Sequence, residues 1–223
     1  MATEFKTITT KSKIQLPNNL VRSPEVSAIE FVILLRLKYL ASFRNNNNYT
    51  LEVDMSKFKL NVGINDNRTL KKYFKQLYEK GYLVDKVVLS RKGLTTVNVN
   101  GKKLNSKDEY TQLPTPLNER VGEIGHIGIR LLYFYESYIN RYLSTTKQFC
   151  FTSIHTICKE TGLNRGTVQS YNEMLRKKKL LHYDKHKLET SYQYDDNDEL
   201  IFTKYNNHYF VNVNKLSEFE NNA

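Results

Sequence analysis

The 223-residue sequence has no tryptophan, only two cysteines and four prolines, and no long hydrophobic run. No apolar N-terminal stretch resembles a signal peptide. The longest apolar stretch, residues 31–40, is too short and too interrupted by charge to cross a bilayer. With Cys150 and Cys158 as the only thiols, we expect a reduced, cytoplasmic protein without a membrane partner.

Acidic side chains are also scarce, because 23 Asp and Glu stand against 34 Lys and Arg, a net charge of +11. A soluble protein with such an excess usually meets a polyanion, either nucleic acid or an anionic membrane surface. Residues 1–110 carry 20 basic against 10 acidic side chains, whereas residues 111–223 carry 14 against 13. The positive charge that would attract a polyanion is therefore concentrated in the first half. The alternative explanation of the positive net charge is compositional drift, because the chain is rich in Lys, Asn, Ile and Tyr.

The sequence lacks the patterns of the enzymes that act on DNA. A nicking enzyme that attacks through tyrosine needs a metal, usually held by paired histidines or an acidic cluster, and the five histidines form no His-x-His pair. His182, His186 and Cys158 superficially suggest zinc, but there is no Cys-x-x-Cys pair. No Gly-x-x-x-x-Gly-Lys loop is present to hold nucleotide phosphates. We expect no enzymatic activity, no metal and no cofactor.

The sequence does contain an internal repeat. TLKKYFKQLYEKGYL (residues 69–83) returns as TVQSYNEMLRKKKLL (residues 167–181), an offset of 98, and QLPNNL (15–20) returns as QLPTPL (112–117), an offset of 97. Each half shows the same order of expected elements. An apolar helix (28–42 or 127–144) precedes a short strand (49–53 or 149–151), a short helix, a second helix and a hairpin with period-two alternation.

The boundaries of the paired helices carry matching signals. Asp54 and Ser153 can cap the short helices, which end at Gly63 and Gly162. Asn65 and Asn164 stand near the starts of the second helices, where an Asx side chain accepts free backbone N–H groups. Hairpins are expected over residues 82–100, with a turn at 91–93, and from residues 180–188 to 206–214, with 189–200 as a longer acidic turn.

This order of elements is typical of a winged helix. The sequence therefore predicts an α+β fold of two tandem winged helix-turn-helix domains related by internal duplication. The expected domains are residues 1–105 and 106–223, joined near the polar segment 101–109. An amphipathic helix of no particular function would explain the apolar spacing of each repeat, but not the turn before it or the hairpin after it.

The second helix of the first half has a cationic side. At 100° per residue, Leu70, Tyr73 and Leu77 share one side. The opposite side carries Arg68, Lys71, Lys72 and Lys75, with Asn65, Asp66 and Asn67 at the amino end. Lys and Arg neutralise phosphates, Arg can also pair with guanine, and such helices point their amino ends at base edges. The pattern favours a helix in the DNA major groove over an ordinary solvated charged face.

The second helix of the second half has a neutral surface instead. Its equivalent positions are Gly166, Gln169, Ser170 and Glu173, with Arg165 at the start and Arg176 toward the flank. Gln can read adenine and Arg guanine, whereas the Glu would repel phosphate. This unit either reads bases, which we favour, or has turned to self-association. At the first hairpin tip, Arg91 and Lys92 either follow a phosphate strand or form a soluble turn.

Two segments carry a resemblance to a known family. IQLPNNLVRSPEVSAIEFVILLRLKYL followed by NRTLKKYFKQLYEKGYL resembles the amino-terminal winged-helix domain of plasmid and phage replication initiators, and CKETGLNRGTVQSYNEMLRKKKLL is similar to the second module of tandem winged-helix initiators. The resemblance implies binding to repeated sites at a replication origin, without catalytic activity.

We therefore hypothesise a sequence-specific protein that binds double-stranded DNA and initiates replication of a plasmid or phage. Half-sites about 10 bp apart are expected. A transcriptional regulator of a mobile element and a winged-helix adaptor for protein interactions are the alternatives. A homodimer and contacts with host replication proteins stay open.

Overall fold

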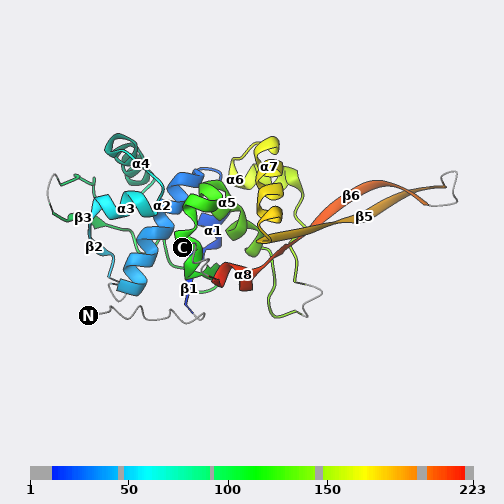
Figure 1. Ribbon diagram of the computed structural model, residues 1–223, viewed down its shortest axis with the longest axis horizontal. Helices are drawn as coiled ribbons and strands as arrows, with labels where there is room; N and C mark the ends of the chain where they lie inside the picture. The colour runs from blue at the N-terminus through cyan, green and yellow to red at the C-terminus, as the bar shows by residue number, and fades with distance from the viewer. Residues whose placement is uncertain (1–11, 45–47, 91–92, 144–147, 195–199, 219–223) are drawn as a thin grey trace.

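The computed structural model describes residues 12–44, 48–90, 93–143, 148–194 and 200–218 (Figure 1). Over these residues the chain is α+β, with eight α-helices and three two-stranded antiparallel sheets. The first half contains β1 (Lys13–Pro17), α1 (Asn18–Val21), α2 (Ala28–Tyr39) with its π-helical extension η1 (Leu40–Arg44), β2 (Thr50–Val53), α3 (Met55–Asn61), α4 (Asn67–Glu79) and β3 (Thr95–Asn98).

The second half has a similar order, but among the described residues it has no strand between α5 and α6, and it ends in two long strands and a further helix. It contains β4 (Tyr110–Pro114), the 3₁₀ helix η2 (Thr115–Glu119), α5 (Val121–Glu136), α6 (Ile154–Thr161), α7 (Arg165–Lys177), β5 (Leu181–Tyr194), β6 (Leu200–Val211) and α8 (Val213–Ser217). α5 is interrupted at Gly125, which has φ 66°. The expected helix 127–144 ends at Glu136, and the expected strand 149–151 is reduced to a single bridge between Cys150 and Tyr209.

The predicted helix caps are confirmed, with one exception. Asp54 accepts the backbone N–H groups of Ser56 and Lys57, and Ser153 accepts that of Thr156. α7 is capped by Asn164, as expected. The cap of α4, however, is Asp66 and not Asn65, because the carboxylate of Asp66 lies three residues before Thr69 and accepts its N–H at 2.7 Å.

The two predicted hairpins differ in the structure. The segment 82–100 pairs only near its base, through the Leu83–Val99 bridge, while β3 also pairs with β2. Val88 is 83% exposed in this segment, whereas Val87 and Leu89 are half-buried against the core. In the second half, residues 189–194 continue β5 instead of forming the turn.

One hydrophobic core extends across both halves. α2 packs against α5, and the rings of Phe31 and Tyr133 meet edge to face with centroids 5.4 Å apart. The Tyr133 hydroxyl donates to the Ile14 carbonyl at 3.1 Å. The segment 101–109, expected as an exposed linker, inserts Leu104 fully into the core.

β1 and β4, which contain the repeated Gln-Leu-Pro segments, pair with each other. The register places Gln15 opposite Gln112, in the middle of the ladder. In Figure 1, α4 and α7 lie on the same side of the molecule, on either side of α2 and α5, and β1 lies on the other side. β2 and β3 lie at one end, and the β5–β6 hairpin projects from the opposite end.

Candidate nucleic-acid interface

α4 exposes the cationic side that the sequence predicts. Its buried residues are Leu70, Phe74 and Leu77, while Tyr73 is half-buried at the edge of the contact. The buried side therefore contains Phe74 in place of the expected Tyr73. We call the exposed set the α4 cationic face: Arg68, Lys71, Lys72 and Lys75.

Few internal charges compete for the α4 cationic face. Lys75 Nζ lies 3.7 Å from Glu79, but these side chains are 73% and 56% exposed, so solvent weakens the pair. Among the described residues no carboxylate lies within ion-pair distance of the other three cations. The positive charge is thus available to an external anion.

The amino end of α4 displays polar groups beside the first hairpin. Asn65 and Asn67 are exposed on either side of the Asp66 cap. The hydrogen bond from the Thr69 N–H lowers the pKa of Asp66 below its ordinary value of 3.8, so this cap is ionised at neutral pH. Asn67 lines a hollow together with Ser90 and Gly93. In the sequence, the hairpin-tip residues Arg91 and Lys92 stand between Ser90 and Gly93, and they lie outside the described residues.

The carboxyl end of α4 is tied to the core. Lys80 Nζ lies 2.5 Å from Oε1 of Glu30, which is buried in α2. The other oxygen of Glu30 accepts the backbone N–H of Ser27 and completes the capping box of α2. Glu30 therefore connects the carboxyl end of α4 to the start of α2.

α7 also exposes its predicted residues, with a different chemistry. Its buried residues are Val168, Asn172 and Leu175. The side chains of Arg165, Gln169, Ser170 and Arg176 are exposed. The structure thus places three exposed side chains that can form hydrogen bonds on α7: Arg165, Gln169 and Ser170.

Arg176 differs from these residues because its charge is partly neutralised inside the protein. Its guanidinium lies 2.9 Å from Glu173 and 5.5 Å from the centre of the Tyr183 ring. Glu173 also accepts a hydrogen bond from the Tyr183 hydroxyl, which lowers the pKa of Glu173, helped by Arg176. Burial and then this contact raise the pKa of Tyr183 to about 12. Because Glu173 partly neutralises Arg176, this residue should attract a phosphate more weakly than its sequence position suggests.

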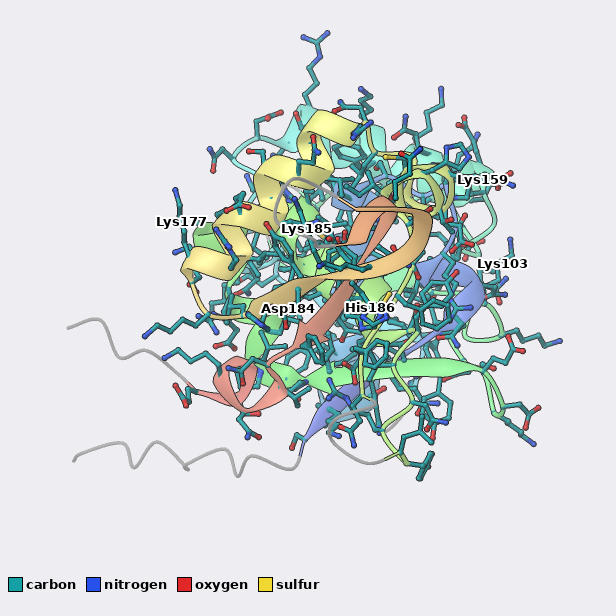
Figure 2. The ribbon with its side chains drawn as sticks, turned by 90° about the vertical axis from the view of Figure 1, so that its right-hand side faces the viewer. Lys103, Lys159, Lys177, Asp184, Lys185 and His186 are labelled. Atoms are coloured by element: carbon teal, nitrogen blue, oxygen red, sulfur yellow. The ribbon has the colours of Figure 1, made fainter. Side chains whose placement is uncertain are left out.

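Sequence reasoning missed Lys185, a cation on the second hairpin. Lys185 is exposed and follows Tyr183 by two positions, so both side chains leave the same face of β5. Tyr183 contacts Glu173, and this face is therefore the one that adjoins α7. In Figure 2, Lys185 lies on one side of the hairpin, and Asp184 and His186 lie on the other. The period-two alternation of side chains along residues 183–187 could have placed Lys185 on the same face as Tyr183.

The part of the chain that the structure describes contains neither a metal site nor a membrane-spanning helix. Over the described residues, no group of three or more His, Cys, Asp or Glu is arranged to hold a metal ion. Within the same ranges, no helix has the length and apolar character needed to span a membrane. A scan against protein-family models and a search of curated proteins found no match to the chain.

Proposed function

We propose that the chain is a sequence-specific double-stranded DNA-binding protein built from two tandem winged helix-turn-helix domains, residues 1–105 and 106–223, and that it initiates replication of a plasmid or phage. The order of elements supports the domain assignment. Each half has a core helix, a short extended segment and a capped helix pair; the second half then ends in the antiparallel strands β5 and β6, whereas the first ends in β3, which pairs with β2 and is followed by the Leu83–Val99 bridge. In this fold the second helix of the pair enters the major groove.

The α4 cationic face is the observation that carries the proposal. Four cations project from one side of a helix whose other side is buried, whose amino end is capped by Asp66 and whose carboxyl end contacts Glu30 of α2 through Lys80. Such a row of cations neutralises phosphates. Arg165, Gln169 and Ser170 on α7 supply base-reading groups. Arg91 and Lys92 extend the phosphate contacts of the first unit.

The first experiment removes two of these cations. Lys71→Ala with Lys75→Ala should weaken binding to every duplex and reduce the slope of log affinity against log salt by about 2. The matched control is Lys13→Ala with Lys107→Ala, which removes the same charge. Lys13 lies in β1, and Lys107 follows Ser106, whose carbonyl accepts from Gln15 of β1. Both lie on the side opposite to α4.

Fluorescence anisotropy with a pool of random duplexes, titrated at several salt concentrations, measures both quantities. Equal losses for the two double variants would show that only total charge matters and would remove the case for α4 as the DNA-binding helix. Absence of duplex binding by the unaltered chain at physiological salt would favour the adaptor. Sequencing the fragments that the protein selects separates an origin from a promoter, and hence an initiator from a transcriptional regulator.

A further inference from the structure

Lys38, in the last turn of α2, is a buried cation whose hydrogen-bond partners are neutral. Its side chain belongs to a residue that is only 6% exposed. Nζ lies 2.8 Å from the Tyr49 hydroxyl and 2.5 Å from Oδ1 of Asn105. Among the described residues, no carboxylate lies within ion-pair distance of this ammonium. Lysine is rarely buried unless an anion compensates its charge, so this position is unusual.

The two partners of Lys38 both line an open hollow of about 860 Å³. The lining also includes the exposed cation Lys102 and the polar side chains of Asn100 and Ser106. None of the described residues that line this hollow is acidic. An ammonium has three donors, and the two printed acceptors of Lys38 use two of them. The hollow is therefore suited to an anion.

A tight turn adds backbone donors to the same hollow. The Lys103 N–H donates to the Asn100 carbonyl at 3.0 Å and closes a four-residue turn. This bond does not use the two middle N–H groups, those of Gly101 and Lys102, and both residues line the hollow. At Gly101 an added Cβ would lie 2.8 Å from Cδ2 of Tyr49, so a glycine lets the turn approach that ring closely. Successive backbone N–H groups in such turns form concavities that bind anions.

The hollow has an apolar part as well. Val84 and Val99 line it, and Val84 is 59% exposed. An inorganic ion at Lys38 would leave the Val84 side chain in water, whereas the organic part of a larger ligand would cover it. Hollows of this size, with an apolar wall and a few convergent polar groups, are typical of sites for small organic molecules.

We propose that this hollow binds a small organic phosphate of the nucleoside monophosphate class. Lys38, Lys102 and the N–H groups of the turn hold the phosphate, and Val84 contacts the organic part. The site lies between α2, which carries Lys38, and the segment 101–109, which joins the two halves. It is separate from the α4 cationic face, and the inference does not depend on DNA binding.

A purely structural role of Lys38 makes a different prediction. The Tyr49 hydroxyl donates to Oδ1 of Asn105 at 2.9 Å, so these two partners stay bonded to each other without the ammonium. Lys38→Met keeps the unbranched stem and removes only the charge. If Lys38 serves a ligand, this variant should be at least as stable as the unaltered chain in the absence of ligand, because a buried charge is gone. If Lys38 serves the fold, it should be less stable.

Isothermal titration calorimetry of the full chain with AMP, inorganic phosphate and adenosine tests the proposal. AMP should bind with one-to-one stoichiometry, inorganic phosphate more weakly, and adenosine not at all. Lys38→Met should weaken AMP binding by about ten- to a hundredfold, as expected for the loss of a hydrogen bond to a charged group. The matched control is Lys103→Met, which removes the same charge from the same turn. Its Nζ donates to the Lys80 carbonyl, and AMP binding should be unchanged.

Thermal unfolding of the three chains without ligand completes the experiment. Absence of AMP binding, equal losses in both variants, or a ligand-free Lys38→Met chain of lower stability would overturn the inference. Inorganic phosphate that binds as tightly as AMP would remove the contact with Val84, and adenosine that binds as tightly would remove the role of the cations. If Lys38→Met weakened duplex binding and left AMP binding unchanged, the hollow would be a DNA contact and the proposal would be wrong.

Discussion

The hydroxyl of Tyr135 lies in the core of the second half, where no water reaches it. It donates to Oδ1 of Asn172 at 2.7 Å, and burial raises the pKa of Tyr135 well above its ordinary value. Asn172 occupies the position of α7 that corresponds to Phe74 in α4, at the 98-residue offset. An apolar core residue in one half is thus replaced by a buried hydrogen-bond acceptor in the other.

Asn172→Leu should therefore destabilise the protein by about 1–3 kcal/mol, because it leaves the Tyr135 hydroxyl without an acceptor. Adding Tyr135→Phe should recover most of that loss, since both polar partners are then gone. Urea unfolding of the two single variants and the double variant gives the coupling energy. Simple addition of the two single losses would show that the hydrogen bond contributes nothing.

Gly162 is the second residue whose replacement should change the stability in a defined direction. Its φ of +69° lies in the left-handed region, and an added Cβ would approach the Pro24 carbonyl oxygen. Gly162→Ala should cost about 1–2 kcal/mol from backbone strain alone. The control is Gly166→Ala inside α7, where a Cβ meets ordinary van der Waals space and should add roughly 0.5–1 kcal/mol of stability. Thermal unfolding should shift in opposite directions for the two variants, and a shift in the same direction would contradict this account.

At the scale of elements, the base of the β5–β6 hairpin carries a column of stacked rings. The ring of His208 stacks on Phe149 with centroids 3.9 Å apart, and the ring of His186 stacks on His208 at 4.4 Å. Burial lowers the pKa of His208 below 6.5, and His186 lowers it further, while Asp184 opposes the shift. The stack therefore favours the neutral imidazole.

This stack predicts a pH dependence of the hairpin. A His whose folded pKa is depressed contributes stability that is fully present above pH 6.5 and is lost as the pH falls through its folded pKa. Hydrogen exchange of β5 and β6 amides should accelerate on acidification from pH 7.5 to 5.5, after correction for the intrinsic rate. His208→Phe keeps a ring in the stack and should remove most of this dependence. An unchanged dependence in that variant would contradict this account.

Local signals predicted most elements, and non-local contacts account for the rest. The Asp54, Ser153 and Asn164 caps and the turns at Gly63 and Gly162 depend on neighbouring residues, so the pattern located them correctly. The pairing of β3 with β2 and of β1 with β4 joins distant segments, and no spacing rule reveals such partners. The length of the second hairpin was underestimated because residues 189–194 are polar.

In the candidate interface, too, the features that depend on one helix were predicted, and those that depend on distant residues were not. Helical periodicity alone located the α4 cationic face, because exposure follows from the buried side of one helix. The partial neutralisation of Arg176 could not be predicted, since it depends on Tyr183, which reaches α7 from another element. The expected Asn65 cap was wrong by one residue because Asp and Asn serve equally well as caps.

At the scale of the whole molecule, the two halves behave as one packing unit. Tyr133 of α5 joins them, because its ring contacts Phe31 and its hydroxyl donates to Ile14, both in the first half. Burial raises the pKa of Tyr133 above its ordinary value, so the hydroxyl stays protonated and keeps this bond. The ladder between β1 and β4 adds a second connection. α4 and α7 therefore pack on the same core.

A change at Tyr133 should consequently destabilise both halves together. Tyr133→Ala should cost about 3–5 kcal/mol, as for other large buried side chains, and Tyr133→Phe about 1 kcal/mol from the lost hydrogen bond. Hydrogen-exchange mass spectrometry in moderate urea should show peptides from α2 and from α5 losing protection at the same urea concentration, because unfolding of a shared core is cooperative. If α2 stayed protected while α5 opened, the halves would be separate folding units. In that case α4 would keep its DNA contacts in Tyr133→Ala, whereas a shared core requires that α4 and α7 lose their DNA contacts together.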